Sequence, residues 1–262
     1  MKTLYMLALL GVSLLTLTAT AQRPNDWQRY EESGHPMPLK GKVSVITART
    51  YNMYNESPTN EIEKERKTVR FNESGMIVRD KTGAYHYDGQ NLRTQKVVDG
   101  TLVECYEYTL GDRGQILTQI TLKNNVESSV AKYSYDAQGR LASIKTYSDG
   151  VLFAEEGYTC NPAGRLVRKT IKGYMGPTCI ADISATYTYN SQGLPSQIVS
   201  KMNSFNGGGT MAEEWKYLEF DKQGNWTKAV VSKGGLGYNS QTSHTQANKE
   251  STMIIREIAY YE

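Results

Sequence analysis

The sequence has little of what marks a catalytic, nucleic-acid-binding or helical membrane protein. It contains three His, three Cys and four Phe, and after residue 21 no apolar run is long enough for a spanning helix. The 30 Lys and Arg nearly balance the 27 Asp and Glu, which is not the charge excess of a nucleic-acid-binding protein. At 39% hydrophobic residues, the chain is too apolar for a disordered one.

The few potential metal ligands are scattered. His35, His86 and His244 lie far apart in the sequence, whereas a metal site needs ligands that converge. We therefore expect no metal, no cofactor and no catalytic residue set. The three cysteines are odd in number, so at least one must stay free or pair between chains.

Tyrosine and glycine are abundant instead, with 19 Tyr and 23 Gly. Tyr, Thr and Val fit a pleated and partly solvated surface, so this composition predicts an all-β protein.

The first residues have the pattern of a secretory leader. A basic start at Lys2 precedes a largely apolar stretch from Leu4 to Leu17, and Ala19 and Ala21 are small residues suited to signal-peptidase cleavage before Gln22. We expect a signal peptide at 1–21, an irregular segment at 22–40 and one β-domain at 41–262. The protein is then exported to the periplasm, the cell surface or the medium, without a transmembrane segment in the mature chain.

An internal repeat organises the β-domain. The segment from Tyr133 to Leu141 reads Tyr-Ser-Tyr-Asp-Ala-Gln-Gly-Arg-Leu, and partial copies begin at Tyr158, Tyr187 and Leu218. Glycines 114, 139 and 164 recur about every 25 residues, and so do the pairs Asp99-Gly100, Asn124-Asn125 and Asp149-Gly150.

The two kinds of marker predict two kinds of hairpin turn. Asp-Gly and Asn-Asn pairs between β-prone runs suit two-residue turns, in which both central residues take positive φ. An Asp or Asn followed three residues later by Gly suits a longer turn that ends in a left-handed bulge. The repeat thus predicts a long antiparallel β-meander of about 16 strands, which curls or coils on itself because open sheets of that size are uncommon.

Alternation along these strands predicts which side chains share the inner face. The predicted inner set is Tyr106, Tyr108, Ile116, Ile120, Leu122, Tyr133, Tyr135, Leu141, Tyr147, Leu152, Tyr158 and Leu166, and the predicted opposite face includes Ile144 and Ile171.

The segment from Tyr133 to Leu141 resembles the tyrosine–aspartate (YD, or RHS) repeat, whose core reads roughly Tyr-Asp-x-x-Gly-Arg-Leu. The resemblance covers about residues 71–231, and only the copy at Tyr135 matches in full. In that family the repeats form extended sheets that coil into strips or shells and serve as scaffolds, surface-binding modules or toxin casings. The resemblance implies a small exported binding or scaffold protein of the cell envelope.

Two functions from different classes remain open. The favoured hypothesis is a non-enzymatic module that binds a surface polysaccharide or an envelope protein through aromatic platforms; the candidate binding residues are Tyr106, Tyr133, Tyr147, Tyr158 and Tyr187. The alternative is a secreted glycan-acting hydrolase that uses carboxylates from Glu61–Glu65 or from the pair Glu213 and Glu214. We expect no nucleic-acid partner, and the sequence leaves the oligomeric state open.

Overall fold

In the computed structural model, residues 29–32, 35–54, 57–204, 207–239 and 244–262 are described, with side chains for 39–53, 63–204, 207–237 and 250–262. These residues form strands and turns without a helix, which confirms the all-β prediction. The strands are β1 (Arg29–Glu32), β2 (His35–Pro38), β3 (Val43–Tyr54), β4 (Ser57–Phe71), β5 (Ile77–Asp80), β6 (Gly83–Tyr87), β7 (Arg93–Val98), β8 (Thr101–Leu110), β9 (Ile116–Lys123), β10 (Val126–Tyr135), β11 (Leu141–Ser148), β12 (Val151–Cys160), β13 (Leu166–Met175), β14 (Thr178–Tyr189), β15 (Pro195–Ser204), β16 (Gly207–Phe220), β17 (Trp226–Asn239) and β18 (His244–Tyr260).

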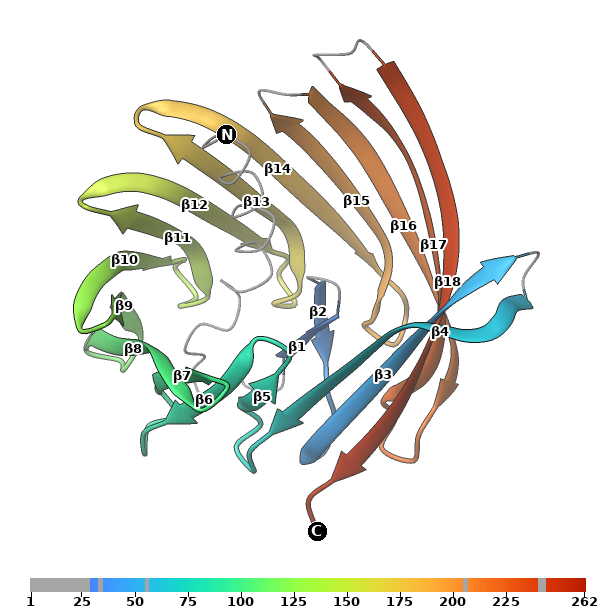
Figure 1. Ribbon diagram of the computed structural model, residues 1–262, viewed down its shortest axis with the longest axis horizontal. Coiled ribbons are helices and arrows are strands. Elements are labelled where there is room, and N and C mark those ends of the chain that lie inside the picture. The colour runs from blue at the N-terminus through green and yellow to red at the C-terminus, as the bar shows by residue number, and fades with distance from the viewer. Residues whose placement is uncertain (1–28, 33–34, 55–56, 205–206, 240–243) are drawn as a thin grey trace.

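Strands β3 to β18 form one closed barrel of 16 strands (Figure 1). Each strand pairs antiparallel with its neighbours in the sequence, and β18 closes the ring by pairing with β3, for example Ile254 with Thr50. The antiparallel meander is therefore confirmed, and its curling takes the form of full closure. The predicted irregular segment 22–40 contains the separate hairpin of β1 and β2. The predicted signal peptide at 1–21 lies outside the described residues.

Two-residue turns join most of the strand pairs at one end of the barrel, which we call the tip end. In the β7–β8 turn, φ is 49° at Asp99 and 78° at Gly100, and in the β11–β12 turn it is 49° at Asp149 and 76° at Gly150. Asn124 likewise has a φ of 51°. The positive φ predicted at both central residues is confirmed, and this geometry matches the right-handed twist of the flanking strands.

Longer turns join the strands at the opposite end, which we call the Asx end. In the β10–β11 turn, Oδ1 of Asp136 accepts hydrogen bonds from the backbone N of Gln138 (2.9 Å) and Arg140 (2.9 Å), and Gly139 has a φ of 75°. The predicted left-handed bulge glycine is confirmed. An Asx side chain accepts a hydrogen bond from the backbone N four residues later in five further turns, at Asn72, Asp88, Asn161, Asn190 and Asp221.

Tyrosine hydroxyls tie paired strands together at the Asx end. Tyr135, the last residue of β10, donates to the carbonyl oxygen of Ile116, the first residue of β9 (2.8 Å). The same link joins other strand pairs: Tyr87 to Ile77 (2.7 Å), Tyr189 to Leu166 (2.5 Å) and Tyr217 to Pro195 (2.7 Å). Because phenylalanine lacks this donor, the links give a structural reason for the excess of Tyr over Phe.

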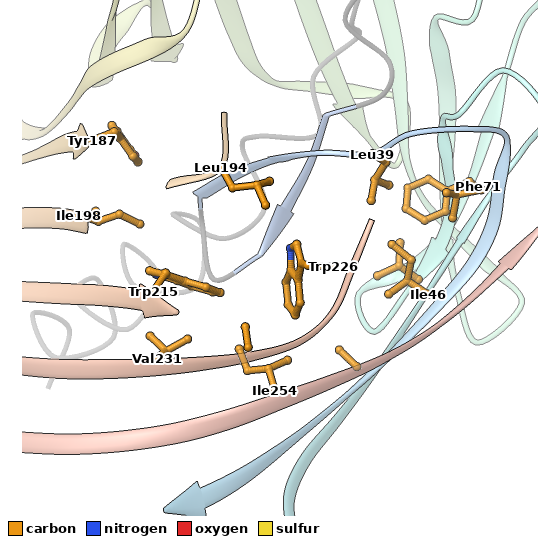
Figure 2. Close-up of a cluster of buried hydrophobic side chains, with 14 residues drawn as sticks. Leu39, Ile46, Phe71, Tyr187, Leu194, Ile198, Trp215, Trp226, Val231 and Ile254 are labelled. Atoms are coloured by element: carbon orange, nitrogen blue, oxygen red, sulfur yellow. The ribbon is translucent and has the colours of Figure 1, made fainter. Parts of the chain in front are cut away.

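The larger hydrophobic cluster lies on the inner face of the barrel, on β3, β4 and β14–β18. Figure 2 shows Trp215, Trp226, Ile198 and Ile254 there, with Trp215 and Trp226 packed edge to face at 6.2 Å. Leu39, which directly follows β2, packs into the same cluster. A smaller cluster of Ile116, Ala131, Tyr133 and Ile144 covers the inner face of β9–β11.

Part of the predicted inner set is wrong. Residues that pair directly share a face, and Ile120 and Tyr147 both pair with Val130, whereas Tyr133 pairs with Ile144. Val130 and Tyr133 are three residues apart and so lie on opposite faces. The reason is that an extra residue reverses the alternation at both ends of the strands: beside the Asx turns, as at the register shift between Ser134 and Tyr135, and beside the tip turns, as at the shift between Thr146 and Tyr147. These shifts move Ile120, Leu122, Tyr147 and Leu152 to the outer face and Ile144 and Ile171 to the inner face.

Candidate binding surfaces

The five predicted binding tyrosines do not form one row. Tyr133 and Tyr187 are buried in the two hydrophobic clusters. Tyr106 and Tyr158 lie on the inner face, and their hydroxyls donate to Glu104 (2.5 Å) and Glu156 (2.6 Å). Tyr147 lies on the outer face, where Nζ of Lys132 is 4.9 Å from the centre of its ring. Most of these tyrosines therefore have packing or hydrogen-bonding roles within the barrel.

A glutamate and an aromatic residue two positions later recur on every fourth strand. The pairs are Glu104 with Tyr106 on β8, Glu156 with Tyr158 on β12, and Glu213 with Trp215 on β16. Residues two apart in a strand share a face, so each aromatic donor reaches its carboxylate. Each glutamate also meets a lysine of the next strand, at 3.5 Å to Lys123, 3.4 Å to Lys169 and 2.9 Å to Lys233. The Glu-x-aromatic spacing is visible in the sequence, and the sequence reasoning missed it.

The ion pair of Glu156 and Lys169 is the most buried of the three. Its side chains are 5% and 7% exposed, and the Lys169 ammonium also lies 5.5 Å from the centre of the Tyr158 ring. Two buried charges are tolerated only when they are paired and hydrogen-bonded. This set meets both conditions, which identifies it as part of the frame of the barrel.

The carboxylates considered for a hydrolase are separated by the sheet. Glu213 is buried on the inner face, paired with Lys233, and the adjacent Glu214 is exposed on the outer face. In the segment Glu61–Glu65, the side chain of Glu61 lies outside the described residues. Glu63 forms an ion pair with Arg66 (2.8 Å), and hydrogen bonding to that guanidinium lowers the pKa of Glu63.

Tyrosine rings surround a buried arginine on the inner face of β6–β8. Arg93 is 7% exposed, and its guanidinium carbon lies 4.0 Å from the centre of the Tyr85 ring, 5.9 Å from that of Tyr87 and 5.8 Å from that of Tyr106. Desolvation raises the pKa of Tyr85 to about 12, and it raises the pKa values of Tyr106 and Tyr108 further. These phenols are therefore neutral hydrogen-bond donors over the physiological pH range.

Exposed aliphatic side chains gather at the tip end. Of the ten large hydrophobic residues exposed in the described part of the chain, the six most exposed lie in the tip-end half of their strands, at 47–67%, and the other four are 36–41% exposed. We call these six the apolar rim: Leu102, Val126, Val151, Met175, Met202 and Leu236. They come from six different hairpins around that end of the barrel.

The cysteines and histidines lie on different strands. Cys105, Cys160 and Cys179 are free, and the side chains of His35 and His244 lie outside the described residues. Within the described residues, no group of three or more His, Cys, Asp and Glu side chains is placed to hold a metal ion. The same part of the chain contains no helix with the length and apolarity needed to cross a membrane.

No protein-family model matches the chain, and no curated protein matches its sequence. Among solved structures, a porin-like protein from Bacteroides uniformis is 13% identical with a TM-score of 0.47, over 84% of this chain and 99% of that one. A porin-like protein from Bacteroides vulgatus is 13% identical with a TM-score of 0.40, over 84% and 98%. The TcdB2–TccC3–Cdc42 structure is 17% identical with a TM-score of 0.36, over 80% of this chain and 12% of that one. At these values the similarity does not carry a function from those proteins to this chain.

Proposed function

We propose that this chain is an exported, non-enzymatic YD/RHS-like repeat protein that acts as a binding module of the cell envelope and contacts a protein partner through the apolar rim. The observation that carries the proposal is the position of the six most exposed large hydrophobic residues, all in the half of their strands nearest the tip end of the barrel.

The chemistry of the rim favours a protein over a polysaccharide. Leu, Val and Met side chains offer aliphatic surface without hydrogen-bonding groups, whereas sugars are bound through polar groups and flat aromatic rings. Methionine is enriched at protein interfaces, and Met175 and Met202 are 51% and 47% exposed. Both residues can adapt their side chains to a partner surface.

The frame that carries the rim supports a binding role. Because the barrel is closed, every strand from β3 to β18 has a paired neighbour on both sides. Tyrosine links such as Tyr135 to Ile116 also join strands at the Asx end. A rim held on such a frame loses little conformational freedom on binding, which favours affinity. The leader at 1–21 and the repeat of about 25 residues support the export and the YD/RHS likeness.

Binding of the purified protein to isolated envelopes of the producing cells tests the proposal. The rim variant is Val126→Ser with Val151→Ser, and the matched control is Leu110→Ser with Leu117→Ser, at the Asx end. We expect the rim variant to bind at least about tenfold more weakly, since each lost aliphatic contact contributes on the order of 1 kcal/mol. The control should bind like the unmodified protein.

The chemistry of the partner is tested in the same assay. Treatment of the envelopes with protease should abolish binding, and periodate oxidation of their glycans should not. Equal binding by the rim variant and its control would overturn the rim as the contact surface. Release of reducing ends from envelope glycan by the purified protein would favour the hydrolase instead.

A further inference from the structure

The guanidinium of Arg93 is buried without a carboxylate beside it. It is 7% exposed, and no Asp or Glu oxygen of the described residues lies within 4.0 Å of its nitrogens. Two other cations of the inner face have such a partner: Lys169 has Glu156 at 3.4 Å, and Lys233 has Glu213 at 2.9 Å. Arg93 instead faces the rings of three tyrosines, which offset only part of the cost of burying a charge.

A register shift turns Arg93 inward. Tyr85 pairs with Lys96 and Tyr87 pairs with Arg93, with an extra residue of β7 between the two pairs. Arg93 and Lys96 are three residues apart, yet both pair with tyrosines of the inner face. The same face of β8 carries Tyr106 and Tyr108. The shift therefore brings two cations and four phenols together on three neighbouring strands.

Several donors of this group are unused. Nη2 of Arg93 makes a long contact to the hydroxyl of Tyr87 (3.4 Å), and its buried Nε has no hydrogen-bond partner. The hydroxyl of Tyr108 likewise has no hydrogen-bond partner among the residues that the structure describes. Tyr87 already donates to Ile77, and Tyr106 donates to Glu104. Glu104 and Asp80 accept from the tyrosines, but no carboxylate of the described residues pairs with the guanidinium of Arg93 itself.

We propose that the Arg93 cluster binds an oxyanion group, a carboxylate or a phosphate, held by the guanidinium of Arg93 and the hydroxyl of Tyr108. A planar guanidinium presents paired N–H donors that match the oxygens of either group. In a desolvated setting this attraction is stronger than at an exposed arginine. The carboxylate of Glu104 also lies on this face, and it already accepts from Tyr106 and pairs with Lys123. This site is separate from the apolar rim and does not depend on the proposed function.

Titration of the purified protein with inorganic phosphate and with glucuronate tests the site, and glucose serves as the uncharged control. The readout is the NMR signal of the Arg93 side chain, together with calorimetric affinity. We expect saturable binding of at least one anion with a shift of the Arg93 signal, and no effect of glucose. Binding of phosphate alone or of glucuronate alone identifies the class of oxyanion, and binding of both identifies the shared chemistry.

Two substitutions distinguish this site from nonspecific anion binding. Arg93→Lys keeps the charge but loses the planar fork, and should weaken binding about tenfold. Tyr108→Phe should weaken it several-fold, whereas Tyr147→Phe, on the outer face, should leave it unchanged. The absence of saturable binding, or a Tyr108→Phe protein with unchanged affinity and an unshifted Arg93 signal, would overturn the proposal even where the Arg93 variant does not fold.

Discussion

The hydroxyl of Tyr135 donates a hydrogen bond to the backbone carbonyl of Ile116, 2.8 Å away at the start of the neighbouring strand. Ile116 is buried, and the last pair of β9 and β10 toward this end is Thr118 with Lys132. Tyr87, Tyr189 and Tyr217 make the same link elsewhere in the barrel. The phenol therefore continues the pairing of two strands beyond their last backbone hydrogen bond.

Replacing Tyr135 by Phe should lower the free energy of unfolding by about 1 kcal/mol, the usual value of one such hydrogen bond. The matched control is Tyr147→Phe, because the Tyr147 hydroxyl makes no hydrogen bond within the described part of the chain. That change should cost less than about 0.5 kcal/mol. Urea unfolding of both variants measures the difference, and equal losses would contradict a structural role for the link.

Gly139 should tolerate Asn better than Val. Its φ of 75° lies in the left-handed region, and no atom lies within 4 Å of the position that a Cβ would take. Any loss therefore comes from backbone strain, which is about 1–2 kcal/mol for a branched residue and smaller for Asn. Thermal unfolding of Gly139→Val and Gly139→Asn tests this. Gly150→Asn, in a two-residue turn, should also cost less than Gly139→Val, and the reverse order would mean that the turn geometry is wrong.

The turns were predictable because they follow from local chemistry. Asp136 and Gly139 have a spacing whose hydrogen bonds and positive φ belong to the turn itself. The faces were predictable only in part. Alternation correctly places Tyr108 and Tyr133 inward, but it fails for Tyr147 because the extra residue that follows Leu141 reverses the face of the rest of β11.

The candidate sites were less predictable than the fold. The strand that begins at Arg93 reads as a solvated one, and only pairing across three strands brings its guanidinium onto Tyr85. The apolar rim follows from a property of the whole meander, since alternate turns meet at one end only when the strands form a single sheet. Neither relationship can be obtained from spacing within one segment.

Removing either partner of the buried ion pair of Glu156 and Lys169 should destabilise the barrel. Glu156→Gln or Lys169→Met leaves one buried charge without its partner, and each should lower the free energy of unfolding by about 3 kcal/mol. Replacing both residues should cost less than the sum of the two changes, which a double-mutant cycle measures. Glu155→Gln, which breaks the more exposed pair with Lys145, should cost less than about 1 kcal/mol. Additive losses in the buried pair would contradict the coupling.

Alkaline pH should destabilise the barrel before Tyr85 ionises in the folded state. Burial raises the pKa of Tyr85 to about 12, whereas an unfolded tyrosine ionises near 10. Between these values the unfolded chain has lost a proton that the folded chain keeps, so stability is present below pH 10 and is lost as the pH rises toward 12. Two measurements at each pH test this prediction: the phenolate absorbance of the folded protein and its free energy of unfolding. Tyr85→Phe should lose stability less steeply, and an identical alkaline slope would contradict this pKa shift.

The pairing of β18 with β3 has a consequence for how the chain reaches its folded state. All other pairings in the barrel join strands that are consecutive in the sequence, so each can form as soon as its hairpin has been made. The ring itself closes only when Ile254 meets Thr50, with the Tyr261 backbone N donating to the carbonyl of Lys42 nearby (2.8 Å). Until then β3 and the newest strand are unpaired edges, open to pairing with other chains. A chain interrupted before β18 is therefore a substrate for aggregation and proteolysis, and cellular quality control can distinguish it from the finished protein by those two edges.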